Sequence, residues 1–192
     1  MRTAVVFIIV VFAIAFIVIG LSASSEAQAQ KDTYRRKLAQ PTEIQGYPCD
    51  RGYAWFFSDG KLQKCTVTRE IPYGEITIPA GSWITLTDDG KPWGVQMPND
   101  APMLGLTCQG GSFLGPSEGA VVSLYPNGRL HVCYLAHDQL VQGVPCSHGG
   151  FWASLTGPDP GVHFAPDGKL QRCRLSSDYQ GHRRGEIFVA SR

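Results

Sequence analysis

Cysteine is the residue type in this chain with the clearest capacity for chemistry, because a thiol can form a disulfide or bind a metal ion. Zinc sites typically use C-x2-C or H-x3-H spacing, and neither pattern occurs in the sequence. We therefore expect no metal site. We expect the six cysteines to form disulfides, and they are Cys49, Cys65, Cys108, Cys133, Cys146 and Cys173.

The five histidines and the carboxylates do not form a pattern typical of catalysis. His131 occupies a position that glutamine fills in two related segments, which indicates a surface position. There is no Ser-His-Asp set and no G-x-S-x-G motif. We therefore expect a protein that is not an enzyme and uses no cofactor. The alternative is a small extracytoplasmic hydrolase that uses His148 or His163 in a pocket lined by residues 110–119 and 149–161.

The nine residues that end in Cys65 recur twice along the chain, ending in Cys133 and in Cys173. FSDGKLQKC (57–65), YPNGRLHVC (125–133) and APDGKLQRC (165–173) share an Asp or Asn, a Gly, a basic residue and a Leu. A related segment without cysteine contains Asp89-Gly90-Lys91. Self-similarity at a period of about 30–40 residues is typical of stacked supersecondary units. The predicted units cover about 45–74, 75–103, 104–142 and 142–185.

The shared turn predicts a β-hairpin with a type I turn and a glycine bulge, because Gly adopts a positive φ there. In this register Leu124 pairs with Leu130, and the equivalent pairs are Phe56–Leu62 and Phe164–Leu170. Positions three and five residues before the Asp or Asn are apolar in every unit, which is typical of a half-buried antiparallel sheet. The predicted fold is therefore all-β, with four tandem hairpins in a meandering or solenoid-like sheet stapled by disulfides.

Each cysteine-containing unit has one cysteine before its outgoing strand and one on its return strand. This arrangement predicts disulfides within units. The main alternative joins neighbouring units. The within-unit pairs are Cys49–Cys65, Cys108–Cys133 and Cys146–Cys173. The alternative pairs are Cys65–Cys108 and Cys133–Cys146, with Cys49 and Cys173 as the two remaining cysteines.

The segments YPNGRL, SDGKL and PDGKL resemble those of bacterial secreted proteins with tandem NGKL hairpins, loosely similar to the MORN and YwqK-like repeat families. The resemblance covers about residues 44–185. The tyrosine and glycine spacing typical of MORN repeats is absent. The resemblance implies a non-enzymatic β-repeat fold and names no ligand.

The start of the chain has the three parts of a secretory signal peptide. Arg2 precedes an apolar run from Ala4 to Ile19, and Ala27-Gln28-Ala29 provides a cleavage site. We expect a signal helix, cleavage after Ala29 and an extracytoplasmic location, periplasmic or secreted. The alternative is an uncleaved membrane anchor. The predicted organisation is a signal peptide over 1–29, a basic linker over 30–43 and one β-repeat domain over 44–192.

The formal net charge of +1 gives no global reason to expect nucleic acid or another polyanion as a partner. Two local basic clusters lie within residues 31–37 and 172–184. We interpret both as solvated. The alternative for the second cluster is contact with anionic envelope polymers. No membrane contact is expected after signal cleavage.

Aromatic residues gather in the first two units. Tyr53, Trp55 and Phe57 alternate with core-facing residues, so they share the opposite face of the sheet. Trp83 falls at the position equivalent to Tyr53 and therefore on the same face. These four side chains are candidates for a platform that binds sugar rings or a partner protein. The alternative is that other segments of the chain cover this face.

Two inserts, GGSFLGPSEG and GGFWASLTGPDPG, occur at equivalent places in the third and fourth units. Insertions at one place in a repeat emerge on one side of the array, which is often the binding side. Phe113, Phe151 and Trp152 are therefore candidates for ligand contacts or for hydrophobic lids. The expected function is a binding or structural role at the cell envelope, with a protein or a glycan as partner.

Overall fold

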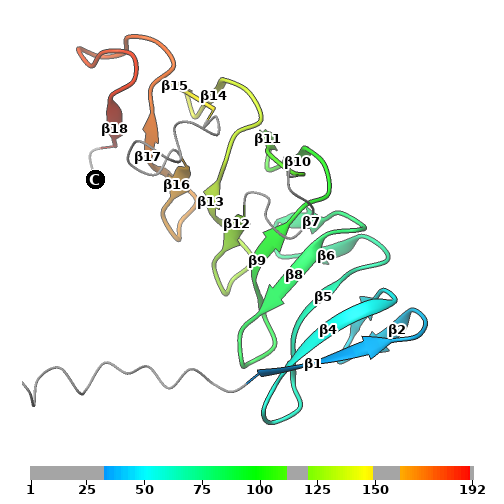
Figure 1. Ribbon diagram of the computed structural model, residues 1–192. Helices are drawn as coiled ribbons and strands as arrows, with labels where there is room; N and C mark the ends of the chain where they lie inside the picture. Colours follow the sequence, from blue (N-terminus) through cyan, green and yellow to red (C-terminus); the bar gives the residue numbers. More distant parts are fainter. Residues whose placement is uncertain (1–32, 112–120, 149–160, 191–192) are drawn as a thin grey trace, which may run out of the picture. The chain divides into compact units, whose positions relative to one another are not determined.

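The computed structural model describes residues 33–111, 121–148 and 161–190, which lie in a compact unit that begins at Thr33 (Figure 1). The predicted signal peptide lies outside the described residues. These residues form eighteen strands and no helix. Ten strands form one antiparallel sheet, in the order β1 (Thr33–Leu38), β4 (Gly52–Phe57), β5 (Leu62–Thr66), β8 (Trp83–Leu86), β9 (Pro92–Gln96), β12 (Val121–Leu124), β13 (Leu130–Cys133), β16 (Val162–Phe164), β17 (Leu170–Arg174) and β18 (Ile187–Val189).

The large sheet is a chain of four hairpins, and the predicted register is confirmed. Phe56 pairs with Leu62, and Leu124–Leu130 and Phe164–Leu170 are the equivalent pairs. One residue further from the turn, the register shifts at Gln63, His131 and Gln171, which form a second bulge that the sequence interpretation did not predict. In the third hairpin the Gly128 N–H donates to the Tyr125 carbonyl (2.9 Å), and Gly128 has a φ of 79°. The D/N-G sequence therefore forms the turn that its backbone preferences predict.

The sequence interpretation missed a second set of four short hairpins. Each short hairpin comes directly before one of the large hairpins along the chain. Their two-residue turns have positive φ at Gln45-Gly46, Leu104-Gly105 and Gln142-Gly143, as type I′ turns require, whereas Gly74 begins a turn of the II′ kind. The predicted unit boundaries near 74, 104 and 142 are therefore wrong, since they cut these hairpins at their tips. The short hairpins are β2 (Thr42–Ile44) with β3 (Tyr47–Cys49), β6 (Ile71–Tyr73) with β7 (Ile76–Ile78), β10 (Ala101–Met103) with β11 (Leu106–Cys108), and β14 (Gln139–Val141) with β15 (Val144–Cys146).

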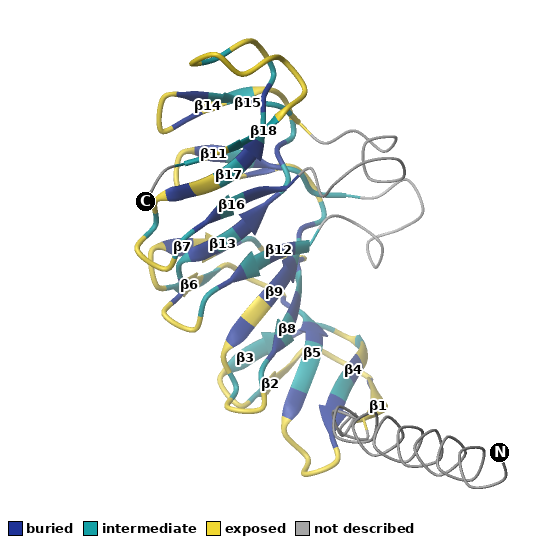
Figure 2. Ribbon diagram, turned by 90° about the vertical axis from the view of Figure 1, so that its left-hand side faces the viewer, coloured by how far each residue is buried: buried dark blue, intermediate teal, exposed yellow. Residues whose placement is uncertain are grey.

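The short hairpins pack on one face of the large sheet, and the hydrophobic core lies between the two layers. The predicted apolar positions all point into this core, and buried and partly buried residues alternate along strands such as β8 (Figure 2). We call the opposite surface of the large sheet the outer face. The core-facing residues at the predicted positions are Ala54, Phe56, Ile84, Leu86, Val122, Leu124, Val162 and Phe164.

Three of the four short hairpins are each joined by a disulfide to the return strand of the large hairpin that follows, and the cysteine pairs are the predicted ones. Cys49–Cys65, Cys108–Cys133 and Cys146–Cys173 have Cα–Cα distances of 5.7, 5.8 and 5.7 Å. No cysteine is free. Three disulfides are compatible with an extracytoplasmic protein, because oxidising compartments preserve them.

The second unit replaces the disulfide with an apolar pair. Ile78 and Val95 occupy the two cysteine positions, and both side chains are fully buried. In the first unit the Asp50 N–H donates to the Thr66 carbonyl, and the Thr68 N–H donates to the Pro48 carbonyl. Proline has no N–H, so the second unit cannot repeat these two bonds, because Pro79 and Pro98 stand at the donor positions.

Residues 33–38, which the sequence interpretation placed in a flexible basic linker, form the edge strand β1. It pairs with β4 over six residues, from Thr33↔Phe57 to Leu38↔Gly52. Leu38 is buried in the core, which explains why the segment is ordered despite its charges. Exposed basic residues on an edge strand oppose pairing with a second sheet. The linker prediction is therefore wrong for this segment.

Glutamine side chains fasten two short hairpins to the large hairpin of the same unit. The Gln142 side-chain amide donates to the Gly168 carbonyl (2.9 Å), and its oxygen accepts from the Leu170 N–H (2.9 Å). Gln45 makes the same two bonds to Gly60 and Leu62. These bonds satisfy backbone groups beside the bulge, where the sheet ladder is interrupted.

Replacing Gln142 by alanine is expected to lower the free energy of unfolding by about 1–2 kcal/mol, because two backbone groups lose their partners. The measurement is a urea titration. Gln180→Ala is the matched control, because Gln180 occupies the same turn position but donates to the Tyr179 hydroxyl (3.1 Å). Equal losses in the two variants would contradict the fastening role of Gln142.

Candidate functional site

Three of the four predicted platform residues form a continuous cluster on the outer face. The Tyr53 and Trp55 ring centroids lie 6.3 Å apart, and those of Trp55 and Trp83 lie 5.0 Å apart. The planes are tilted by 58° and 51°, respectively. The strand order explains the proximity, because Trp55 in β4 and Trp83 in β8 flank β5. We call Tyr53, Trp55 and Trp83 the aromatic cluster.

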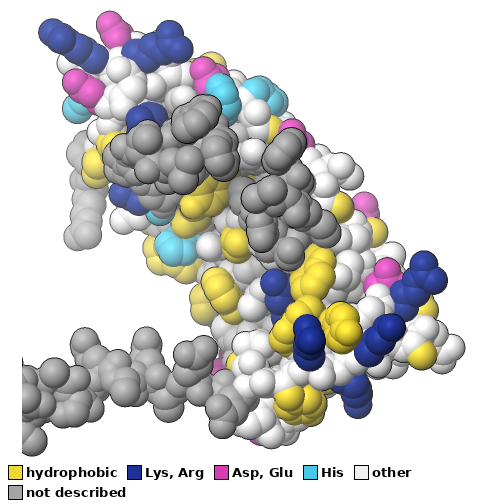
Figure 3. Space-filling model, viewed as in Figure 1, with side chains coloured by type: hydrophobic (Ala, Val, Ile, Leu, Met, Phe, Trp, Pro, Cys, Tyr) yellow, Lys and Arg dark blue, Asp and Glu magenta, His cyan; other side chains and the backbone are white. Residues whose placement is uncertain are grey.

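Cationic side chains lie over two of these rings. The Arg35 guanidinium carbon is 4.8 Å from the Tyr53 centroid, and Lys64 Nζ is 4.6 Å from the Trp83 centroid. Lys64 Nζ also donates to Gln96 Oε1 (3.2 Å), and burial lowers the pKa of Lys64. Figure 3 shows hydrophobic and basic side chains side by side over the β1–β8 end of the sheet. Cation–π contact holds the two kinds of side chain together here.

The aromatic cluster is partly accessible to solvent. Tyr53 is 46% exposed, and Trp55 and Trp83 are half-buried. Phe57 is only 9% exposed and does not belong to the main core. The prediction that Phe57 contributes to an open platform is therefore wrong, because its side chain is covered. Phe113, Phe151 and Trp152, the candidates in the inserts, lie outside the described residues.

Trp93 is an exposed aromatic residue that sequence reasoning missed, with 45% of its surface accessible. It stands at the bulge position between Pro92, which pairs with Leu86, and Gly94, which pairs with Thr85. Hydrophilic Gln63 and Gln171 occupy the equivalent bulges in other units. A tryptophan in a position that elsewhere holds glutamine was the signal available in the sequence.

The histidines considered as catalytic bases have structural partners. Arg172 Nη2 lies 2.9 Å from His163 Nε2, and because arginine only donates, this histidine nitrogen is the acceptor. His148 Nδ1 lies 2.6 Å from Asp138 Oδ1, which also accepts from the His148 N–H (2.8 Å). These hydrogen bonds lower the pKa of Asp138. An Asp–His pair of this geometry can orient an imidazole for proton transfer.

The Asp138 carboxylate also accepts a backbone hydrogen bond, and two other aspartates make the same bond where no histidine side chain takes part. Asp100 Oδ1 accepts from the Gly110 N–H (2.9 Å), and Asp178 Oδ1 accepts from the Arg184 N–H (2.7 Å). In each case the aspartate precedes a short hairpin or its turn and bonds to the backbone after it. The recurring function of this aspartate is therefore to close the loop around the hairpin.

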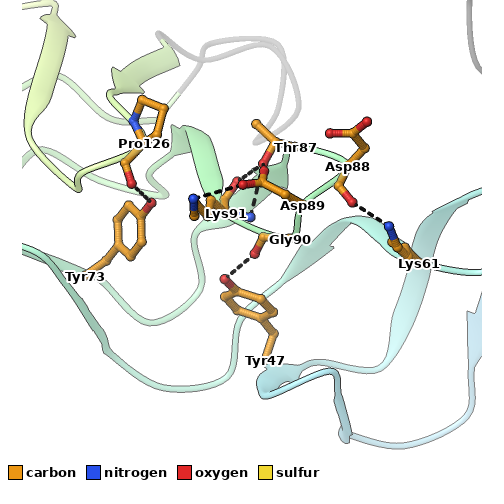
Figure 4. Close-up of polar contacts among 9 residues, drawn as sticks. All are labelled: Tyr47, Lys61, Tyr73, Thr87, Asp88, Asp89, Gly90, Lys91 and Pro126. Atoms are coloured by element: carbon orange, nitrogen blue, oxygen red, sulfur yellow. Dashed lines mark hydrogen bonds and ion pairs between the residues drawn. The ribbon is translucent and has the colours of Figure 1, made fainter.

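Tyrosines link the first units along the array, as Figure 4 shows. The Tyr47 hydroxyl in β3 donates to the Gly90 carbonyl (2.8 Å), and the Tyr73 hydroxyl in β6 donates to the Pro126 carbonyl (3.1 Å). Each bond joins a short hairpin to the large-hairpin turn of the following unit. The third short hairpin has Met103 and Leu106 at the corresponding positions beside its turn.

A pocket of about 250 Å³ lies at the junction of the third and fourth units. Phe164 and Leu106 contribute apolar surface, and an ion pair between Arg129 and Glu75 (3.1 Å) lies in its lining. The pocket lies among the hairpin tips, whereas the aromatic cluster occupies the outer face. Its lining does not include the predicted platform residues.

The described ranges contain no group of three or more His, Cys, Asp or Glu side chains arranged to hold a metal ion. In the same ranges no helix has the length and apolarity of a membrane span. No protein-family model, curated protein or solved structure matches the chain.

Proposed function

We propose that this protein is an exported, disulfide-stabilised β-repeat protein that acts by binding a protein or a glycan at the cell envelope. The observation that carries the proposal is the aromatic cluster on the outer face. The core lies on the other side of the sheet and is already filled by side chains from the short hairpins. Trp55 and Trp83 are therefore not needed to close the core, and partly exposed aromatic rings are typical of binding surfaces.

The rest of the array supports a binding role through its rigidity. The Cys49–Cys65 disulfide and the pairing of β4, β5 and β8 within the ten-stranded sheet fix the backbone beneath the cluster. A surface that is ordered before binding loses little conformational entropy when it meets its partner. Equivalent positions to Trp55 hold Thr85, Ser123 and His163, so the fold accepts small or polar residues there.

Trp55→Ala is expected to weaken binding about fivefold or more, since one ring of the cluster contributes about 1 kcal/mol or more. Binding is measured on a panel of purified polysaccharides and by capture from an envelope extract. Leu140→Ala is the control, because Leu140 is 71% exposed on the short hairpin β14–β15. Unchanged binding by Trp55→Ala, with an unchanged melting temperature, would contradict a role for the cluster.

The second candidate is a small hydrolase that uses His148, and the Asp138–His148 pair is the observation that favours it. Asp100 and Asp178 make the same backbone bond as Asp138 without a histidine partner. This recurrence favours a structural role for Asp138 over a catalytic one. The inserts that would line such a site lie outside the described residues. Hydrolysis of an ester or glycoside substrate that His148→Asn abolishes would establish the alternative.

A further inference from the structure

Charged residues are strongly segregated in the fold, although the formal net charge of the chain is only +1. None of the ten strands of the large sheet contains an aspartate or a glutamate. The described acids lie instead in turns, connections and short hairpins, as Asp59, Glu75 and Asp167 illustrate. The basic residues in the ten strands are Arg35, Arg36, Lys37, Lys64, Arg172 and Arg174.

Strand pairing places three of these cations among the rings of the aromatic cluster. Arg35 and Lys64 are the two neighbours of Trp55 across the sheet, and Lys37 pairs with Tyr53. Residues paired across antiparallel strands lie on the same face. Arg35, Lys37, Tyr53, Trp55, Lys64 and Trp83 therefore form one surface, which we call the basic aromatic surface.

We propose that the basic aromatic surface binds an acidic polysaccharide. Pyranose rings would lie against Trp55, Trp83 and Tyr53, and the anionic groups of the polymer would pair with Arg35, Lys37 and Lys64. This inference rests on the proposed binding function and names the ligand class. Charge-assisted hydrogen bonds to carboxylate or sulfate groups are about twice as strong as neutral ones, so an anionic polymer gains most from these cations.

The composition of the surface favours an acidic polymer over a neutral one. Sugar hydroxyls donate hydrogen bonds, and carboxylate side chains would be the strongest acceptors for them. The strands beneath the surface supply no carboxylate, and the amide oxygen of Gln96 already accepts from Lys64. The surface is therefore rich in donors, which matches a ligand rich in anionic acceptors.

The geometry favours a glycan over single-stranded nucleic acid. Bases stack on aromatic side chains through their flat faces. The rings of the cluster are tilted by 51° and 58° to one another, and Arg35 and Lys64 lie over two of them. Such an arrangement offers apolar edges and cations to a polymer of puckered rings, but no parallel platform for successive bases.

The test is a tryptophan-fluorescence titration of the exported protein with polygalacturonate and dextran sulfate as acidic probes and dextran as the neutral probe. At least one acidic probe should bind at low salt and bind more weakly at high salt, because salt screens exposed charges. Arg35→Gln and Lys64→Gln should each weaken this binding about three- to tenfold. Lys169→Gln should not, because its side chain is 81% exposed in a turn away from the surface.

Several outcomes would overturn the inference, and they separate it from the proposed function. Equal affinity for dextran and both acidic probes, lost in Trp55→Ala, would remove the acidic specificity and leave a glycan-binding protein. Tighter binding to single-stranded DNA than to either acidic probe would exclude a glycan as the preferred ligand. Equal weakening by Lys169→Gln would reduce the effect to general charge attraction. If none of the three polysaccharides binds and capture from an envelope extract does not depend on Trp55, both the acidic-polysaccharide proposal and the proposed function are wrong.

Discussion

Gly128→Ala is expected to lower the free energy of unfolding by about 3 kcal/mol or more, a much larger loss than the same change in an equivalent turn. Gly128 has a φ of 79°, where any side chain is strained by about 1–2 kcal/mol. A Cβ at this position would also lie 2.7 Å from the Gly74 Cα and 2.9 Å from the Gly74 nitrogen. Backbone atoms cannot rotate away, so the two hairpin tips would have to separate, which costs a further 1–3 kcal/mol or so.

Gly90→Ala and Gly168→Ala are matched controls for this effect. These glycines occupy the same turn position with φ values of 80° and 86°, but nothing lies within 4 Å of a Cβ built on either. Their losses should therefore contain the backbone strain alone. Asn127→Ala should cost less than Gly128→Val, because Asn127 occupies an ordinary turn position. Equal thermal and urea stabilities for the three glycine variants would contradict the close approach of Gly74 and Gly128.

The double variant Ile78→Cys/Val95→Cys is expected to form a fourth disulfide and to be about 3 kcal/mol more stable oxidised than reduced. Ile78 and Val95 occupy the positions that paired cysteines occupy in the other three units. The new loop would have a sequence separation of 17 (95 − 78), close to the 16 of Cys49–Cys65. Closing a loop of this length removes about 3 kcal/mol of chain entropy from the unfolded state.

Comparing the oxidised and reduced forms of one variant separates the disulfide from the apolar packing that the substitutions remove. Peptide mapping without reduction should recover a peptide that joins residues 78 and 95, together with the three native pairs. The single variants Ile78→Cys and Val95→Cys control for the lost packing. Two free thiols in the oxidised double variant would mean that the second unit holds its short hairpin farther from the return strand than the other units do.

The large hairpins and their disulfides were predictable because local rules specify them. A positive φ at glycine and a side-chain period of two fix the turn and the register, and both can be recognised within nine residues such as YPNGRLHVC. The short hairpins follow an equally local rule, since Gln45-Gly46 and Gln142-Gly143 lie between apolar residues. They were missed because strands of three residues have too little alternation to recognise.

The candidate site was predictable in part. Parity along β4 placed Tyr53 and Trp55 on the outer face, and the repeat placed Trp83 with them. Parity could not show that Phe57 is covered, because burial depends on which other segments pack against a residue. Arg35, one of the cations over the rings, belongs to the supposed linker, whose pairing with β4 the sequence interpretation did not predict.

The sequence by itself determined the turn type, the strand pairs next to each turn and the within-unit disulfides, because these features depend on backbone preferences and spacing inside one unit. Only the tertiary structure decided which of the equivalent turn glycines is crowded, since Gly74 and Gly128 meet through the stacking of different units. It also decided that the outer face is basic. Pairing ten strands that lack acids brings their cations together on one sheet, while the acids lie in turns, connections and short hairpins. The formal net charge of +1 does not reveal this separation.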